Sequence, residues 1–333
     1  MRARNKPGTA LVVGSHGFIG SYISRLLIQL GWKVIGIDAL FMYKPEQWDL
    51  YQRNFYYRQT ELLTGLTKFY RIDASQAVEV LEILQMHKPE IVINVGGSSV
   101  ADQCKSNIGE AVNSIYLLNA NLLQCMKNLE SLKRYTYISS SMVYGDFEDN
   151  EPTEESPKNP KDPYGAIKLG GEYLVESFNR QFQLPYTIIR PSAVYGPFDS
   201  NLRVTGIFMA NAFQGIPLRV NDPQELLDFT FVEDVAQGIV HATTSDNGLN
   251  QTFNMTRGSA RTIHEFAQEI KRHLPDTSVV VGQSDEHMPG LIRPKRGTLS
   301  MRKSVELLEY QPSRDIEYGV GKYVESWRRI YGN

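Results

Sequence analysis

The sequence predicts an α/β fold: a doubly wound, mostly parallel sheet followed by a smaller C-terminal lobe. Three observations support this fold class. Short apolar runs alternate with helical apolar spacing through roughly residue 190. A glycine-rich turn follows the first apolar run, and beyond residue 190 the pattern weakens into shorter segments. We therefore expect a sheet domain over residues 1–190 and a lobe over residues 191–333, with some segments of the lobe returning to the sheet.

Six apolar runs are expected to form the strands, because each is short and rich in β-branched or aromatic residues. These runs are residues 9–13, 33–37, 68–72, 91–97, 135–138 and 186–190. Apolar residues at helical spacing predict helices at about 21–30, 108–129 and 164–182. The segment from Phe41 to Arg58 is aromatic and rich in Gln and Arg, and its irregular pattern predicts neither an element nor a role.

A glycine pattern joins the first expected strand to the first helix. Gly14, Gly17 and Gly20 have the spacing G-x-x-G-x-x-G. The first glycine allows a tight turn, the second lets the backbone approach a pyrophosphate, and the third lets the helix pack closely on the strand. The helix N-terminus adds free N–H groups and the positive end of its dipole. The turn therefore predicts a dinucleotide site, and a glycine turn without a ligand is the alternative.

An acidic residue at the end of the second strand narrows the choice of dinucleotide. Asp38 can accept hydrogen bonds from both hydroxyls of an adenosine ribose and would repel a 2′-phosphate, so the expected cofactor is NAD and not NADP. Asp73, after the third strand, is expected either to meet the adenine amino group or to cap a surface turn. The other expected cofactor contacts are the loop residue His16 and Phe18, Ile19, Ala74, Val95, Gly96, Gly97, Tyr164, Lys168 and Pro191.

A tyrosine and a lysine four residues apart are the main candidates for catalysis. Tyr164 and Lys168 fall on one face of the expected helix at 164–182. There the ammonium can stabilise a phenolate, whose usual pKa is about 10. Ser140, in the run Ser139-Ser140-Ser141, can hold the substrate oxygen whose proton Tyr164 removes. Together these residues can oxidise an alcohol by hydride transfer beside a nicotinamide ring, although the Tyr–Lys spacing alone is also common on protein surfaces.

Composition argues against several other classes of protein. The net charge of −2 disfavours a general affinity for nucleic acid or anionic membranes. No run of 18 apolar residues predicts a membrane span, and the first residues lead into a strand and not into a secretory signal. Cys104 and Cys125, expected in a loop and a helix, show no spacing typical of a disulfide or metal site. We expect a cytoplasmic enzyme without a metal.

Five motifs, in order, resemble those of the extended short-chain dehydrogenase/reductases, and in particular the nucleotide-sugar epimerase/dehydratase family. They are the glycine turn at 14–20, Ser-Ser-Ser-Met-Val-Tyr-Gly at 139–145, Tyr-x-x-x-Lys at 164–168, Arg-Pro-Ser-Ala-Val-Tyr-Gly-Pro at 190–197 and the segment 228–236. The resemblance covers nearly the whole chain. It implies a Rossmann-type domain that binds NAD, a nucleoside-diphosphate sugar between the two lobes, and often a homodimer through the helices at about 108–129 and 164–182.

The residues that follow Ser140 distinguish among the reactions of that family. Dehydratases carry Asp-Glu where this chain has Ser141 and Met142, decarboxylases usually carry Glu at the second position, and 3,5-epimerase/reductases carry Cys there. A thioether cannot donate or accept a proton near neutral pH. The resemblance therefore implies hydride transfer at sugar carbon 4, by a 4-epimerase or by a 4-ketoreductase (4-dehydrogenase). A dehydrogenase of a non-nucleotide alcohol and a non-enzymatic nucleotide sensor are the remaining alternatives.

The resemblance also implies roles for individual residues. Tyr164 would take the proton of the 4-hydroxyl with Ser140 bridging, and Lys168 would bind the nicotinamide ribose and lower the pKa of Tyr164. The family commonly has an arginine that grips the diphosphate where this chain has Leu227. The candidate substrate contacts are Ser99, Ser140, Ser141, Met142 and Ser192, together with Arg203, Arg219 and Arg293 as candidate substitutes for the missing arginine.

Overall fold

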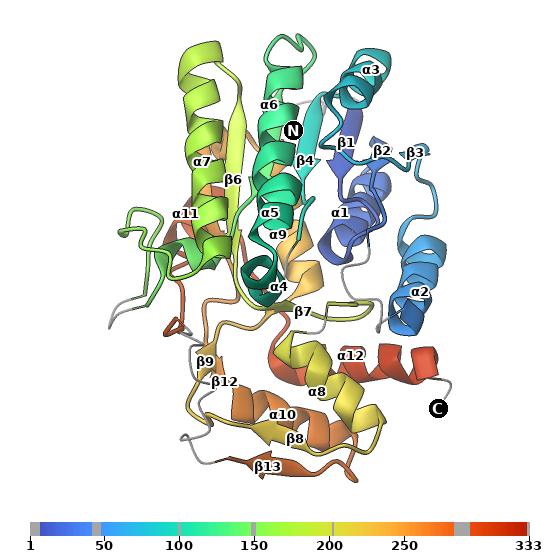
Figure 1. The fold of residues 1–333 in the computed structure, drawn as a ribbon, viewed down its shortest axis with the longest axis vertical. Coiled ribbons are helices and arrows are strands. Elements are labelled where there is room, and N and C mark those ends of the chain that lie inside the picture. Colours follow the sequence, from blue (N-terminus) through green and yellow to red (C-terminus); the bar gives the residue numbers. More distant parts are fainter. Residues whose placement is uncertain are drawn as a thin grey trace.

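The computed structural model describes residues 7–41, 48–98, 101–147, 151–201, 203–282 and 294–331. The larger part of the molecule is a seven-stranded sheet with helices on both faces, and a smaller lobe lies beyond one end of the sheet (Figure 1). The predicted α/β fold, with a doubly wound sheet and a smaller C-terminal lobe, is confirmed.

The sheet has the strand order β11-β6-β5-β4-β1-β2-β3, and all of its pairings are parallel. All six predicted strands are present, although β3 and β4 are shorter than expected. The order reverses between β1 and β4, and the carboxyl ends of strands at such a point form a crevice where ligands bind. The strands are Thr9–Val13 (β1), Lys33–Ile37 (β2), Lys68–Tyr70 (β3), Ile91–Asn94 (β4), Arg134–Ile138 (β5), Tyr186–Pro191 (β6) and Gln251–Met255 (β11).

Helices cover both faces of the sheet, which explains why its strands are apolar almost throughout. On one face, α1 (Phe18–Gln29) and α9 (Val232–Thr244) pack against each other and share an apolar core with β1. On the other face, the core includes residues of α3 (Ala77–His87), α6 (Leu118–Met126) and α7 (Pro163–Phe182). The predicted helix at 164–182 therefore forms almost as expected, and the N-cap Asp162 accepts a hydrogen bond from the Gly165 N–H at 2.8 Å.

The single helix predicted at 108–129 is wrong in its details. The segment forms α5 (Ile108–Ala111), a π-helical turn (Val112–Leu117) and α6. Gly97 lies against this turn, where an added Cβ would come within 2.5 Å of the Ser114 carbonyl oxygen. The Ser98 N–H donates to Ser114 Oγ at 3.4 Å. The wider π turn thus brings the helix backbone against the end of β4. Such π-helical turns often occur at functional sites.

The smaller lobe is built from α8 (Val204–Phe213), α10 (Ile263–His273) and α12 (Ile316–Tyr331) with three pairs of short strands. Its core is aromatic and includes Tyr195, Phe229, Phe231, Phe266 and Trp327. The strand pairs are β7–β10 (Val194–Tyr195 with Thr230–Phe231), β8–β13 (Leu218–Val220 with Val279–Val281) and β9–β12 (Leu226–Leu227 with Arg261–Thr262).

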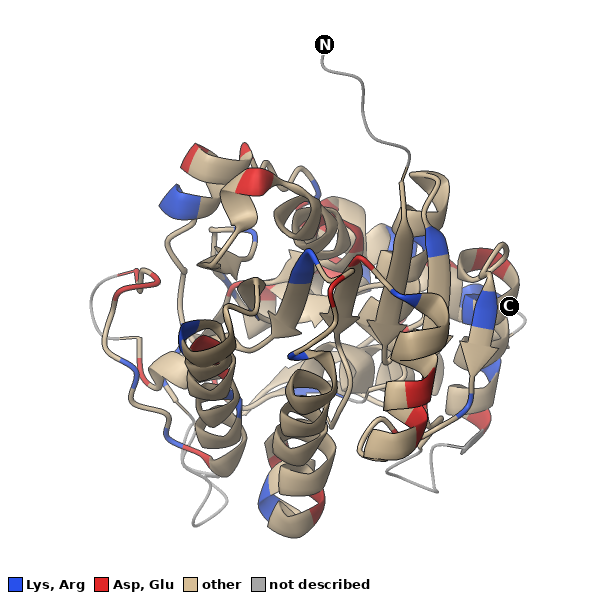
Figure 2. Cartoon of the chain, turned by 90° about the horizontal axis from the view of Figure 1, so that it is seen from above, with Lys and Arg blue, Asp and Glu red and all other residues tan. Residues whose placement is uncertain are grey.

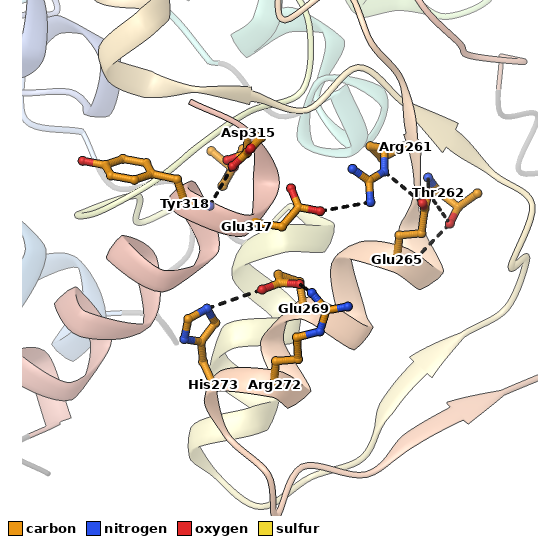
Figure 3. Close-up of polar contacts among 10 residues, drawn as sticks. Arg261, Thr262, Glu265, Glu269, Arg272, His273, Asp315, Glu317 and Tyr318 are labelled. Carbon is orange, nitrogen blue, oxygen red and sulfur yellow. Dashed lines mark hydrogen bonds and ion pairs between the residues drawn. The ribbon is translucent and has the colours of Figure 1, made fainter. Parts of the chain in front are cut away.

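Polar contacts fix the two long helices of the lobe to each other (Figure 3). Thr262 and Glu265 form a capping box at the start of α10. Arg261 donates to Glu265 at 2.9 Å and to Glu317 of α12 at 3.2 Å. The late segments also return to the sheet, because β11 pairs with β6 and α9 packs on α1.

Basic and acidic residues are interspersed along the elements that surround the sheet (Figure 2). Within the described part of the chain, no helix is long and apolar enough to cross a membrane. The same residues contain no group of three or more His, Cys, Asp and Glu side chains placed to hold a metal ion.

Candidate active site

A cavity of about 460 Å³ lies at the carboxyl ends of the strands next to the order reversal. Most of the predicted cofactor contacts line it. These are Gly14, His16, Gly17, Phe18, Ile19, Gly20, Asp38, Asp73, Ala74, Val95, Gly96 and Gly97. Pro191, Tyr164 and Lys168 are not among its lining residues. The cavity therefore corresponds to the part of the site that the glycine turn and Asp38 were predicted to form.

The glycine turn has the geometry of a phosphate cradle. Gly14 adopts a left-handed φ of 80°, and a Cβ at Gly20 would lie 2.0 Å from the Gly14 carbonyl oxygen. Neither position accepts a side chain. Helix α1 begins after Gly17 without a side-chain cap, so its first N–H groups are available to an anion. These features fit the diphosphate of a dinucleotide.

Asp38 and His16 fix the turn to the second strand. The Asp38 carboxylate accepts hydrogen bonds from the His16 N–H at 2.9 Å and the Leu40 N–H at 2.8 Å. The His16 ring lies between Phe55 and Phe69, with ring centroids 5.7 and 3.9 Å away. Burial lowers the pKa of His16 to about 4, so the ring is neutral. His16 is therefore a packed part of the turn and more than the loop residue that we expected.

The segment with no predicted role supplies a buried cation to the same cavity. It contains α2 (Trp48–Tyr57), which continues into a π-helical turn (Arg58–Leu62). The Arg58 side chain lines the cavity and is only 2% exposed. Its hydrogen bond to Ser200 Oγ is long at 3.4 Å. Among the described residues, its Nε has no hydrogen-bond partner and no carboxylate forms an ion pair with it. The aromatic neighbours in the sequence are the only signal that Arg58 would be buried.

The three predicted catalytic residues converge in a buried site beside the cavity. Tyr164 and Ser140 form a side-chain hydrogen bond, and each is 8% exposed. The Lys168 Nζ lies 5.8 Å from the centroid of the Tyr164 ring and donates to the Ile138 carbonyl oxygen at 2.8 Å. Tyr164 is thus enclosed between a hydroxyl and an ammonium, and its hydroxyl does not face bulk water.

The pKa values in this site differ from the expected pattern. Burial raises the pKa of Tyr164 to about 12, and the hydrogen bond with Ser140 opposes this only in part. Burial also lowers the pKa of Lys168 to about 8. We expected Lys168 to lower the pKa of Tyr164, but desolvation dominates in the protein without a ligand. Phenolate formation therefore needs a further positive charge near the ring.

A buried ion pair holds the elements that carry the catalytic residues. Glu172, one turn after Lys168 on α7, accepts hydrogen bonds from Arg190 at 2.9 and 2.6 Å. Glu172 also accepts a hydrogen bond from the Ser139 hydroxyl, and Arg190 donates to the Tyr144 hydroxyl at 2.8 Å. This network ties the carboxyl ends of β5 and β6 to α7.

Arg296 joins three of the predicted substrate contacts. Its Nη2 donates to Ser141 Oγ and Ser192 Oγ at 2.8 Å each, and its Nη1 lies 2.8 Å from Met142 Sδ. No sequence pattern selects Arg296, because it lies far along the chain from all three partners and in none of the five motifs. The structure brings these residues together next to Ser140.

The remaining candidate substrate residues have different surroundings. Arg203 lines the cavity and donates to Asp199 at 3.2 Å, whereas Arg219 is exposed on β8. Ser99 and Arg293 lie outside the described residues. Leu227, which replaces the family's arginine, pairs with Arg261 across β9–β12. The Arg261 side chain itself donates hydrogen bonds to Glu265 and Glu317 (Figure 3).

Cys104 lies in α4 (Ala101–Ser106) and not in the expected loop. It is buried in a small cluster with Tyr164 and Ile115. Burial raises the pKa of its thiol. Its position indicates that Cys104 packs in the same cluster as Tyr164 as an apolar side chain.

Comparisons with known proteins identify the family of the chain. The profile of the NAD dependent epimerase/dehydratase family matches residues 10–256. The chain is 29% identical over 272 residues to dTDP-glucose 4,6-dehydratase of Haemophilus influenzae, covering 78% of each chain. It is 27% identical over 331 residues to UDP-glucose 4-epimerase of Mycolicibacterium smegmatis, covering 96% of this chain and 98% of the relative.

A solved structure shows the same fold over almost the whole chain. UDP-glucuronic acid 4-epimerase from Bacillus cereus, in complex with UDP-glucuronic acid and NAD, superimposes with a TM-score of 0.86. The identity is 23%, and the match covers 97% of this chain and all of the other.

The sheet, the glycine turn and the cavity define a dinucleotide-binding enzyme. The match over residues 10–256 then shows that the chain belongs to the NAD-dependent epimerase/dehydratase family. This membership confirms the predicted family and NAD as the cofactor.

Proposed function

We propose that this protein is a nucleotide-sugar 4-epimerase that inverts sugar carbon 4 through a 4-keto intermediate. One observation carries the proposal. Tyr164 and Ser140 are hydrogen-bonded in a buried site, and the Lys168 ammonium lies beside the same ring. Such a group can exchange a proton with one substrate hydroxyl. NAD, when bound, supplies a hydride acceptor and donor.

The chain's own residues have distinct tasks in this reaction. Tyr164 accepts the proton of the 4-hydroxyl during oxidation and returns it when the ketone is reduced on its opposite face. Ser140 bonds the same oxygen and holds it within reach of Tyr164. Lys168, with a pKa of about 8, is still mostly protonated at neutral pH and stabilises the phenolate. Because burial raises the pKa of Tyr164 to about 12, the positive charge of an oxidised dinucleotide is needed as well.

The two positions after Ser140 support epimerisation over dehydration. Elimination of water requires an acid and a base in addition to the tyrosine. Ser141 and Met142 offer a hydroxyl and a thioether, neither of which titrates near neutral pH. Both side chains also contact Arg296, which cannot act as a base.

The proposal is tested by incubating the purified protein in D₂O with UDP-glucose, UDP-galactose, UDP-glucuronic acid and dTDP-glucose. Melting shifts with UDP, GDP, TDP and CDP first identify the nucleotide. We expect the C4 epimer of one sugar with no deuterium bound to carbon, because the hydrogen leaves and returns as a hydride. A product that has lost water and taken up deuterium, or no product from any sugar, would falsify the proposal.

A 4-ketoreductase would use the same three residues once and then release its cofactor. An epimerase must retain the reduced cofactor, since its escape would strand the keto sugar. Protein that carries about one tightly bound NAD(H) per chain therefore supports the epimerase, and rapid exchange with free NAD(P)H indicates the reductase. Thermal stabilisation by none of the four nucleoside diphosphates would indicate a dehydrogenase of another alcohol.

We further infer that the protein forms a homodimer through α5, α6 and α7. These helices lie side by side on one face of the sheet (Figure 1). They expose large apolar side chains, namely Ile108 (53% exposed), Tyr173 (56%) and Phe182 (42%). A two-fold interface would remove this surface from water. Tyr173→Arg should convert a dimer to a monomer in analytical ultracentrifugation, and a wild-type protein that is already monomeric contradicts the inference.

A further inference from the structure

Among the described residues, the partly buried cation of Arg296, next to the candidate catalytic residues, is bound only by neutral groups. The Arg296 guanidinium contacts two hydroxyls, of Ser141 and Ser192, and the thioether of Met142. Its Nε is fully buried and has no hydrogen-bond partner among the described residues. Nor does any carboxylate in the described part of the chain form an ion pair with it.

Within the described part of the chain, this arrangement leaves a charge without a direct counter-charge. Arginine stays protonated at any physiological pH. A buried charge without an ionic partner is costly, and neutral hydroxyls compensate for it only in part. Burial lowers the pKa of Arg296 and outweighs the influence of the Glu225, Asp228 and Asp162 charges. The oxygens of Asp228 accept hydrogen bonds from the backbone N–H groups of Gly258 and Leu299. Arg296 therefore has the features of an anion site.

The position of Arg296 indicates which anion would reach it. Ser141 directly follows Ser140, which is hydrogen-bonded to Tyr164, so the guanidinium lies beside the reacting end of the substrate. In a pyranose, the diphosphate on carbon 1 is across the ring from carbon 4. A carboxylate on carbon 5 is attached to the neighbour of carbon 4. The anion nearest the catalytic pair is therefore a carboxylate of the sugar itself.

We propose that Arg296, together with Ser141 and Ser192, binds the carboxylate of a nucleotide-linked uronic acid, so that the enzyme selects an acidic sugar over a neutral one. This inference rests on the proposed function and specifies its substrate class. The planar guanidinium can bind a carboxylate through two parallel hydrogen bonds. The two serine hydroxyls are placed to hold the same group.

The test measures binding and not turnover. The Tyr164→Phe protein, saturated with NAD, is titrated by calorimetry with UDP, UDP-glucose and UDP-glucuronic acid. We expect UDP-glucuronic acid to bind at least about tenfold more tightly than UDP-glucose. Adding Arg296→Met should abolish this preference and leave UDP and UDP-glucose within about twofold of their original affinity.

Two further variants keep the test decisive. Arg302→Met removes an exposed arginine of α11 (Arg302–Leu308) and should change none of the three affinities. Arg296→Lys keeps the positive charge but not the two parallel N–H donors of the guanidinium, so it should retain only part of the preference for UDP-glucuronic acid. This variant replaces Arg296→Met if Arg296→Met does not fold. A preference that survives the loss of Arg296 overturns the proposal, as does the absence of tighter binding by UDP-glucuronic acid. An equal loss for all three ligands also overturns it, because it would place Arg296 at the diphosphate.

Failure of this inference is distinguishable from failure of the proposed function. The Tyr164→Phe protein is not expected to turn over, so its binding preference does not depend on whether carbon 4 is inverted. The D₂O experiment alone decides that question.

Discussion

The cofactor half and the proposed sugar half of this site are built in different ways. The predicted contacts of the cofactor half lie in short local patterns at the ends of β1, β2, β3 and β4, although remote residues such as Arg58 and Arg203 also line the cavity. The sugar half combines Ser141, Ser192 and Arg296, which come from three distant segments of the chain. The predicted dinucleotide contacts are therefore encoded locally, whereas the proposed sugar contacts depend on how remote segments meet.

The largest expected effect separates chemistry from cofactor binding. Tyr164→Phe should lower kcat by about 10³- to 10⁴-fold, because it removes the proton acceptor, while bound NAD remains in place. Turnover of the sugar identified by the substrate screen and cofactor extraction measure the two properties. Tyr173→Phe, an exposed position on the same helix, is the control and should change neither. Residual activity above about a tenth of wild type would contradict the assignment.

The ion pair of Glu172 and Arg190 supports both halves, and breaking it should destabilise the whole protein. Glu172→Gln leaves the Arg190 charge buried without a partner, and we expect a loss of about 3–5 kcal/mol in the free energy of unfolding. Urea denaturation measures the loss. Glu176→Gln, which breaks the exposed pair with Arg180, should cost less than about 1 kcal/mol. Similar losses of unfolding free energy in the two variants would show that the buried pair stabilises the protein no more than the exposed pair does.

Acid should weaken the cofactor half through His16. Its pKa is about 4 in the folded protein and 6.5 when unperturbed. Between these two pKa values, His16 binds a proton in the unfolded chain but not in the folded chain. The free energy of unfolding therefore decreases as the pH falls from about 6.5 to about 4. His16→Phe keeps an aromatic ring and cannot titrate, so it should remove up to about 3 kcal/mol of this pH dependence. Urea denaturation at about pH 7 and about pH 4.5 measures it, and an unchanged dependence would refute the role of His16.

The smallest expected effect concerns Arg58. Arg58→Met should weaken NAD binding by about tenfold to a hundredfold, because it removes a buried cation from the cavity that accepts the diphosphate. Fluorescence titration of cofactor-free protein with NADH gives the affinity. Arg53→Met, on the same helix but exposed and bonded to the Ile330 carbonyl oxygen, should leave it unchanged. Equal affinities in both variants would remove Arg58 from the cofactor site.

The sequence predicted the strands, the glycine turn and the converging Ser140, Tyr164 and Lys168, because each depends on local spacing. A parallel strand must be apolar, and a turn around a phosphate must exclude side chains. Residues placed by such rules can be found without knowing what surrounds them.

The residues that sequence reasoning missed depend on long-range packing. Arg58 is buried only because α2 folds over the glycine turn, and Arg296 only because its segment reaches Ser141 and Ser192. The π turn at 112–117 arises where a helix meets Gly97. The raised pKa of Tyr164 likewise reflects the depth of the site, which a four-residue spacing does not reveal.

The pairing of β11 with β6 also has a consequence for synthesis on the ribosome. Strand β6 is buried along most of its length in the finished protein, yet its neighbour emerges only after much of the smaller lobe has been translated. Until then β6 is an unprotected apolar edge, open to pairing with other nascent chains. Truncation before residue 251 should therefore yield insoluble protein and not a free cofactor-binding domain.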